Sequence, residues 1–196
     1  TWARGGIGAF LAGLAHAFSD RVGRLLVPTS GGTDPIQPDS CHPMLVPFFS
    51  STAVDLVLDG QAETRIGKTR LVADWPAALA ILQPCQQHEI EPDAVNCGRC
   101  NKCARTMVVL RAIGRLDAAT SFPRLPVDVA YVRGMHVANE FDVSCHRESA
   151  ALLRASGEAD LAQALERRAA AWVRRRKLRA LRGRLLGRVA PAGEQA

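Results

Sequence analysis

Residues 97–103 read Cys-Gly-Arg-Cys-Asn-Lys-Cys, and the fold prediction starts from them. The two-residue gaps let a knuckle turn aim successive sulfur atoms at one point, as a tetrahedral zinc ion with Zn–S distances of about 2.3 Å requires. Gly98 permits the backbone twist of such a turn, and the N-terminus of the helix expected next lowers thiol pKa values. A further thiol follows Pro84 at loop distance. We therefore predict one zinc site with four thiolate ligands, which are Cys85, Cys97, Cys100 and Cys103.

Four sulfur ligands leave no coordination position open for water, so the predicted site is structural rather than catalytic. Buried thiols without metal are one alternative, but three thiols at strict spacing argue against it. An iron–sulfur cluster is another, yet the ferredoxin pattern carries a further cysteine followed by Pro, which is missing just after Cys103. His88 is an alternative ligand to Cys103, and we favour Cys103 because it makes use of every clustered thiol. Cys41 and Cys145 stand apart and are expected to be ordinary thiols.

The composition is that of a globular chain. Its 196 residues and 47% hydrophobic content suit one domain, or one domain with a helical appendage. Six cysteines are too few for a disulfide scaffold, and no export signal is visible, so we expect a cytoplasmic protein without a membrane span. Because the opening at Thr1 already looks helical, we expect the sequence to start inside a larger protein. Neither a monomer nor a homodimer is excluded.

The hydrophobic pattern predicts an α/β layer architecture. Apolar residues at helical spacing predict a helix from Ile7 to Phe18. Two short apolar runs around a loop rich in Pro and Gly predict a buried strand over 24–27 and a second strand over 54–58. Further helices are predicted over 64–75, 76–82, 104–113, 148–154 and 160–172, with a basic run over 174–186. Two strands do not complete a sheet, so part of it is expected outside this chain. The expected division is an α/β domain over 1–121 and a helical extension over 122–196.

Residues 96–105 resemble the C-terminal signature of 7-cyano-7-deazaguanine synthase and its PP-loop relatives. In that family a cysteine, a short loop, Cys-Gly-x-Cys-x-x-Cys and a nearby Arg hold a structural zinc. Residues 39–43 look like the family's Asp-Cys-Arg-Pro segment, and residues 64–72 look like its Leu-Ser-Lys-Ala-Glu-Ile helix start. The resemblance runs in collinear order over about residues 4–115, and only its cysteine part is specific.

The resemblance implies a Rossmann-like fold of the adenine nucleotide alpha hydrolase type, with a partial parallel sheet and ATP at the carboxyl ends of its strands. It also implies ATP with Mg²⁺, adenylation of a carboxyl or carbonyl oxygen, release of pyrophosphate, and displacement of AMP by ammonia or another nucleophile. Lys68 and Arg65 would lie near phosphate, with a solvated helix face as the alternative. His42 and Asp39 would lie near the small-molecule substrate.

The chain departs from the family in its substrate segment and in its phosphate loop. His42 stands where the synthase has Arg, the segment has one extra residue, and Arg105 comes one position early, all of which fit a divergent relative better than the synthase itself. Residues 30–34 spell Ser-Gly-Gly-Thr-Asp, close to the family's ATP loop. Pro35 and Pro38 follow, and no helical pattern continues from them, so we interpret this stretch as a coincidence. The true loop is expected before Thr1.

Arginines dominate the chain from 167 to 188, where no Asp or Glu occurs, and this segment accounts for the positive net charge of +6. A helix of this kind could contact RNA phosphates or another acidic partner. The alternative, which the sequence favours slightly, is a solvated helix docked through its leucines. The runner-up to the enzyme hypothesis is therefore a non-catalytic zinc knuckle that binds RNA through its basic C-terminal helices.

Overall fold

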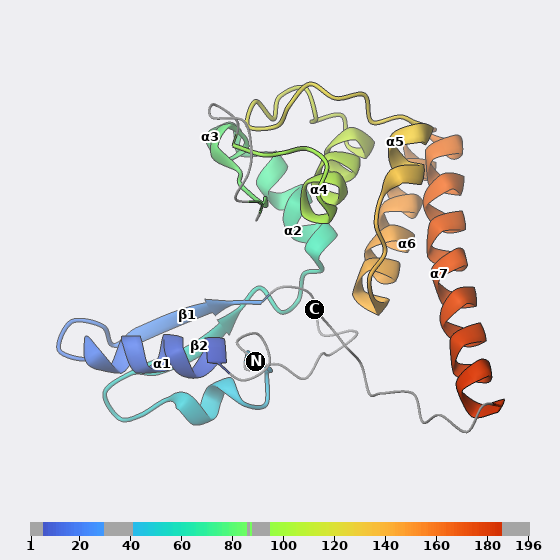
Figure 1. Cartoon of the computed structure of the whole chain (residues 1–196). Coiled ribbons are helices and arrows are strands. Elements are labelled where there is room, and N and C mark those ends of the chain that lie inside the picture. The colour runs from blue at the N-terminus through green and yellow to red at the C-terminus, as the bar shows by residue number, and fades with distance from the viewer. Residues whose placement is uncertain (1–5, 30–40, 86, 88–94, 186–196) are drawn as a thin grey trace. The chain divides into compact units, whose positions relative to one another are not determined.

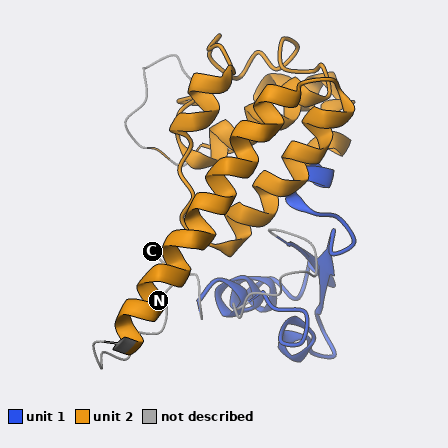
Figure 2. Cartoon of the chain, turned by 90° about the vertical axis from the view of Figure 1, so that its right-hand side faces the viewer, with its two compact units in different colours: residues 1–68 blue, residues 69–196 orange. Residues whose placement is uncertain are grey.

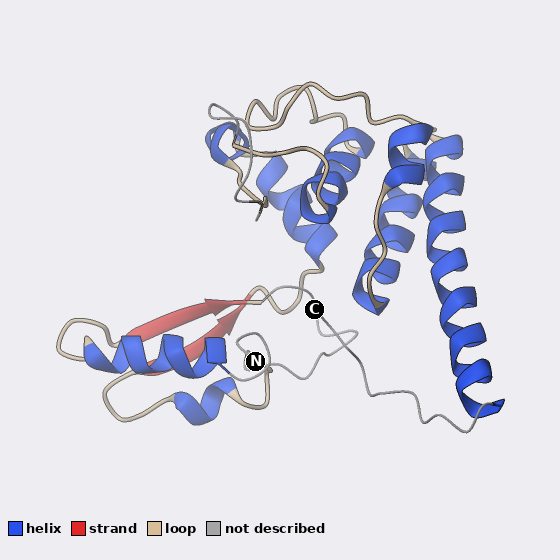
Figure 3. Cartoon of the chain, viewed as in Figure 1, coloured by secondary structure: helices blue, strands red, loops and turns tan. Residues whose placement is uncertain are grey.

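The computed structural model describes residues 6–29, 41–85, 87 and 95–185. The chain forms two compact units, residues 1–68 and residues 69–196, each with its own hydrophobic core (Figure 2). Helices dominate the described residues, and one two-stranded parallel sheet accompanies them (Figure 3). The predicted mixture of helices with a parallel sheet is thus confirmed, as a small sheet of two strands among helices.

The first unit is built on two parallel strands, β1 (Arg24–Pro28) and β2 (Asp55–Asp59). Parallel strands need a crossover connection, and here the connection contains the 3-10 helix η2 (Val46–Phe49). The helix α1 (Ile7–Ala17) precedes β1 and contacts both β1 and η2 (Figure 1). Both predicted strands and the first predicted helix are therefore present.

The apolar stripe that predicts α1 is buried only in part, through Ala15 and the partly buried Leu11. Ala12 and Ala15 are 5% and 6% exposed, whereas Phe10, Leu14 and Phe18 are 55%, 49% and 52% exposed. Small side chains let the helix approach a narrow two-stranded sheet closely, and the larger ones extend past it. The same narrowness corrects the prediction of a buried first strand, since Leu26 is 57% exposed.

The helices α2 (Arg65–Ala73) and α3 (Pro76–Ile81) begin where the sequence predicts. The Thr64 hydroxyl accepts a hydrogen bond from Gly67 N at 2.9 Å, which satisfies one of the free N–H groups of the first turn of α2. Pro76 ends one helix and starts the next, because proline has no N–H to donate but fits the first helical turn.

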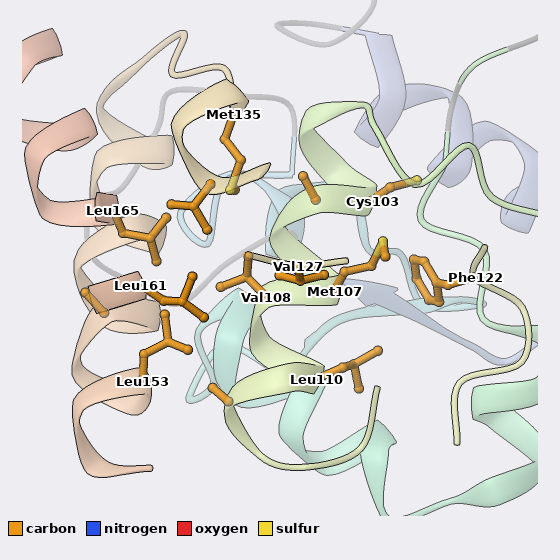
Figure 4. Packing of buried hydrophobic residues seen from close by; sticks show 14 of the residues in the cluster. Cys103, Met107, Val108, Leu110, Phe122, Val127, Met135, Leu153, Leu161 and Leu165 are labelled. Carbon is orange, nitrogen blue, oxygen red and sulfur yellow. The ribbon is translucent and has the colours of Figure 1, made fainter. Parts of the chain in front are cut away.

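The second unit packs helices around α4 (Asn101–Ala112), which is buried on almost all sides. α5 (Val129–Gly134), α6 (Glu140–Ala155) and α7 (Ala159–Leu185) complete the unit (Figure 1). Figure 4 shows side chains of α4 between those of the α6–α7 pair on one side and Phe122 on the other. α5 lies in the extension over 122–196 that the sequence predicts to be helical, although no separate helix is predicted at its position.

The α6–α7 pair is the predicted helical hairpin, with both helices longer than expected. Gly157 has a φ of +85°, and Glu158 N donates to Leu153 O at 2.8 Å, so a left-handed glycine closes α6. The basic run continues the second helix without a break as far as Leu185. None of the described helices is both long enough and apolar enough to span a membrane.

Along the chain, the boundary between the two compact units falls between Lys68 and Thr69, whereas the sequence predicts a domain boundary between residues 121 and 122. The physical reason for the difference is that α4 shares one core with the later helices. Arg105 of α4 also forms an ion pair with Asp142 of α6, 2.6 Å between Nη2 and Oδ1, with both side chains largely buried.

Candidate metal centre

Three of the four clustered thiols lie at the N-terminus of α4. Cys100 is its N-cap residue, with extended backbone angles of φ −67° and ψ 161°. Cys97 lies on the turn before it, and Cys103 lies in the first helical turn, fully buried. A turn followed at once by a helix therefore gathers thiols that are close in sequence, as the two-residue gaps predict.

The four sulfur atoms converge on one point. The Sγ atoms of Cys85 and Cys100 are 3.9 Å apart, and those of Cys97 and Cys103 are 3.8 Å apart. All four Sγ atoms lie within 4.8 Å of one another, and the cysteines are free of disulfides. This cluster could hold a metal ion, because a tetrahedral ion with four sulfur ligands at about 2.3 Å separates them by roughly 3.8 Å.

Backbone N–H groups support the knuckle. Cys100 N and Arg99 N donate to Cys97 Sγ at 3.2 Å and 3.4 Å. Hydrogen bonds of this kind fix the orientation of a thiolate ligand and spread its negative charge. They also explain why the turn holds its shape ahead of α4.

Asn96 holds the Cys85 loop to the knuckle, and the sequence analysis missed this role. Its side chain is 1% exposed and accepts from Cys85 N at 3.2 Å. Its amide nitrogen donates to Leu82 O at 2.8 Å and to Ser121 O at 2.9 Å. Asn96 thereby joins three separate segments at the cluster. A polar residue directly before the first knuckle cysteine is the only sequence signal for it.

Gly98 is required by both its conformation and its surroundings. Its φ is +67°, and an added Cβ would lie 2.5 Å from Pro123 Cγ and 2.8 Å from Leu125 Cδ1. Tyr131 of α5 donates its hydroxyl proton to the carbonyl oxygen of Gly98. The short helix α5 thus supports the turn through this hydrogen bond.

The thiols differ in how readily they ionise. Burial opposes ionisation of Cys85, but hydrogen bonds from the backbone of Cys97 and Gln87 outweigh it and lower its pKa to about 7. Burial raises the pKa of Cys100 and of Cys103. Neighbouring thiolates repel one another in such a place, so a divalent cation would complement the site by stabilising all four in the charged form.

Lys68 lies at the carboxyl ends of the two strands. Its Nζ donates to the Thr29 carbonyl oxygen at 2.8 Å and to Thr29 Oγ1 at 2.6 Å, and Thr29 directly follows β1. Thr29 N in turn donates to Asp59 O, at the end of β2, at 3.1 Å. The pKa of Lys68 is lowered, chiefly by burial and then by the nearby charge of Arg65. The structure therefore brings Lys68 and Arg65 close to each other at the sheet edge.

Among the described residues, the structure does not bring the other predicted site residues together. His42 Nδ1 accepts from Met44 N at 3.1 Å, which shapes its own turn. Asp39, His88 and the Ser-Gly-Gly-Thr-Asp stretch over 30–34 lie outside the described residues. Arg105 is engaged in the buried ion pair with Asp142.

A comparison of the chain with protein-family models, curated proteins and solved structures finds no match.

Proposed function

We propose that Cys85, Cys97, Cys100 and Cys103 bind one structural Zn²⁺ ion. The observation that carries this proposal is the convergence of four sulfur atoms, with pairs at 3.8 and 3.9 Å. Tetrahedral sulfur ligation suits zinc, and four protein ligands leave no place for a substrate or a water. The ion would therefore stabilise the fold without taking part in a reaction. A reducing, cytoplasmic compartment would keep the thiols available.

The same distances argue against a cluster of several iron atoms. In such a cluster the four thiolates are shared among two or four irons, so sulfur atoms bound to different irons stand farther apart than around one ion. Here all four lie within 4.8 Å of one another. The spacing supports a single ion at the centre.

The zinc proposal is tested with Cys100→Ser, which removes one ligand and replaces it with a hydroxyl. Because zinc binding contributes directly to folding, we expect this variant to lose its metal and to melt well below the wild type. Cys41→Ser is the matched control, since Cys41 lies outside the cluster and the substitution makes the same chemical change. If a chelator that strips the protein of zinc leaves the melting temperature unchanged, a structural role is ruled out.

We further propose that the chain is part of an ATP-dependent adenylating ligase or amidating enzyme of the PP-loop kind, similar to 7-cyano-7-deazaguanine synthase. Two observations support this proposal besides the cysteine signature. The strands β1 and β2 are parallel, and Lys68 lies at their carboxyl ends, where open α/β sheets bind ligands. A Rossmann-like sheet and ATP with Mg²⁺ belong to this proposal.

Lys68 and Arg65 would neutralise phosphate charge in such an enzyme. The ammonium group of Lys68 already faces oxygen acceptors, the carbonyl and hydroxyl of Thr29. Phosphate oxygens would replace these acceptors, and the guanidinium of Arg65 at the start of α2 would add a second positive charge. His42 and Asp39 are the proposed substrate contacts.

Nucleotide binding tests the enzyme proposal separately from the zinc proposal. Calorimetric titration of the zinc-loaded chain with MgATP should give binding that Lys68→Met weakens about tenfold or more, because a charge-assisted hydrogen bond is lost. Lys102→Met removes an equal charge elsewhere and should bind as the wild type does. Absence of any MgATP binding by a correctly metallated chain would exclude nucleotide binding by this chain and leave the metal centre untouched.

A further inference from the structure

An arginine-lined cleft lies between α5 and α7. It has a volume of about 340 Å³, and its lining includes Arg133 of α5 and Arg167, Arg168, Gln163 and Asp160 of α7. Three guanidinium groups against one carboxylate leave the lining net positive. None of these residues belongs to the cysteine cluster or to the sheet edge.

Arg168 builds the cleft. Its guanidinium donates to the carbonyl oxygen of Met135, the residue that ends α5, and so fastens α5 to α7. Its Nε is buried and has no hydrogen-bond partner in the described structure. This Nε is out of reach of water, so a ligand in the cleft would contact the other guanidinium groups of its lining.

The other two arginines of the cleft are exposed and unpaired. Within the described ranges, Arg133 and Arg167 have neither an ion pair nor a hydrogen bond through their side chains. By contrast, Arg111 and Arg154 of the neighbouring helices each bind a glutamate, Glu158 and Glu166. The guanidinium groups of the cleft are therefore available to an outside partner.

The positive charge continues from the cleft along α7. Positions seven apart lie on the same face of a helix, about 10.5 Å along its axis. Arg174 and Arg175 follow Arg167 and Arg168 at this interval, and all positions from 174 to 182 are exposed. Arg176 lies on another face, where it pairs with Glu140 and stacks on Trp172. A track of arginines thus runs outward from the cleft.

The leucines of this segment are not docked. Leu178 and Leu181 are 50% and 53% exposed, so the solvated helix held by its leucines, which the sequence slightly favours, is not what the structure shows for these two residues. The exposed part of α7 extends beyond the start of α6, the element with which it pairs (Figures 1 and 2). This leaves a long basic surface open to a partner.

We propose that the α5–α7 cleft binds a phosphate of a single-stranded nucleic acid, whose backbone continues along the arginines of α7. Guanidinium groups bind phosphate oxygens through paired hydrogen bonds, and a row of them matches a linear polymer of phosphates. The cleft is recessed between two helices, which favours this ligand over a membrane surface that would contact the outer face of α7 alone.

The test uses the zinc-loaded chain and a fluorescein-labelled single-stranded RNA of about 12 nucleotides, a length within the usual range of such sites. Fluorescence anisotropy compares the wild type with Arg133→Gln/Arg167→Gln. We expect the double variant to bind about tenfold more weakly at 0.1 M salt, and the slope of log K against log salt to decrease by about 1.4, or about 0.7 for each lost phosphate contact. Both arginines are exposed, so the melting temperature should not change.

Arg70→Gln/Arg147→Gln is the matched control, because it removes the same charge from exposed positions outside the cleft and outside α7. It should weaken binding by less than about twofold, as expected for charge acting at a distance in salt. Equal losses in both double variants would show general charge attraction and overturn the cleft. So would a wild type that does not bind the RNA.

Two further ligands identify the source of the phosphate. Adenosine monophosphate should bind far more weakly than the RNA, and equal affinities would show that the cleft takes one free phosphate group. Vesicles of phosphatidylserine and phosphatidylcholine should not compete with the RNA. Vesicle binding that depends on Arg133 and Arg167, in the absence of RNA binding, would replace the nucleic acid with a membrane surface.

Discussion

At the scale of single residues, the turn that carries the cysteines depends on two neighbouring residues, Gly98 and Asn96. Gly98 combines a left-handed backbone with contact to Pro123 and Leu125, and Asn96 satisfies three backbone groups around the cluster. These two residues position the sulfur atoms, although neither contributes a ligand. The chemistry of the thiols therefore rests on neighbours whose roles are purely geometric.

Gly98→Ala should destabilise the chain more than Gly114→Ala. Both glycines have a φ of +67°, so each substitution forces an alanine into the left-handed region at about 1–2 kcal/mol. At Gly114 nothing lies within 4 Å of the added Cβ, whereas at Gly98 the Cβ meets Pro123 and Leu125. Urea unfolding of the two variants in excess zinc measures the difference. Equal losses of stability would mean that the knuckle tolerates the added methyl group.

His146 should make the fold less stable as the pH falls. Burial lowers the pKa of His146 by more than the carbonyl and the carboxylate of Asp142 raise it. The charges of Arg105 and Arg168 lower this pKa further. Below the unfolded value near 6.5 the unfolded chain therefore binds a proton that the folded chain does not, so this stability is present above pH 6.5 and lost below it.

The loss from His146 is at most about 1.4 kcal/mol per pH unit below 6.5. Urea unfolding between pH 7.5 and 5.5, in constant zinc, should show a steeper loss for the wild type than for His146→Gln. The glutamine keeps a group that can donate to the Asp142 carbonyl, as His146 Nδ1 does at 2.8 Å. Identical pH profiles would show that His146 does not titrate between the two states.

At the scale of elements, the second unit is organised by α4 and its link to α6. Nine residues of α4 are buried, and Arg105 pairs with Asp142 while stacking 5.0 Å from the centre of the Phe141 ring. The second carboxylate oxygen of Asp142 accepts from Asn101 Nδ2 and from Ala138 N, both at 2.9 Å. The helix that starts at the cysteines is therefore fastened to the hairpin by a buried charge pair.

Arg105→Met should cost about 3–5 kcal/mol, because it leaves the Asp142 carboxylate buried without its cation. Arg105→Met/Asp142→Asn should cost less than the sum of the two single substitutions, since no unpaired charge stays behind. A double-mutant cycle by urea unfolding measures this coupling. Strictly additive costs would show that the two side chains do not depend on each other.

The sequence predicts the positions of helices and strands better than it predicts which of their faces are buried. Pro76, Gly157 and the cap at Thr64 set boundaries through local chemistry, so the sequence shows where those elements start and stop. The buried face of α1 depends on how wide the sheet beneath it is, and the large apolar residues then lie outside. α5 is too short to show a helical period, and its N-cap Asp128, which accepts from Tyr131 N at 2.8 Å, gives a weak signal in a loop rich in Pro.

The residues of the candidate site also differ in how well the sequence predicts them. The thiols are predictable because their spacing is local, and a sulfur cluster needs no knowledge of distant contacts. Asn96 and Tyr131 act on the cluster through segments that meet only after folding, so no local pattern reveals them. The arginine cleft likewise needs Arg133 and Arg167, which come from different helices, to lie on one cavity.

At the scale of the whole molecule, the chain has two cores of different kinds. The first unit centres on β1, β2 and the small residues of α1, while in the second unit Cys103 belongs to the core and the other three clustered cysteines pack against it. Removing the metal should therefore weaken the second unit selectively. Hydrogen exchange should show faster exchange of amides in α4 and α6 after chelation, with the amides of β1 and β2 unchanged. A uniform increase in both units would mean that they unfold together.

The metal content of the purified, reduced protein tests the central claim most directly. Native mass spectrometry with elemental analysis should find one zinc and no iron per chain, and Cys100→Ser should carry neither. Four sulfur atoms within 4.8 Å of one another would then be the ligands of a single ion. A wild-type chain that folds without stoichiometric zinc, or that carries several iron atoms with sulfide, would contradict the account.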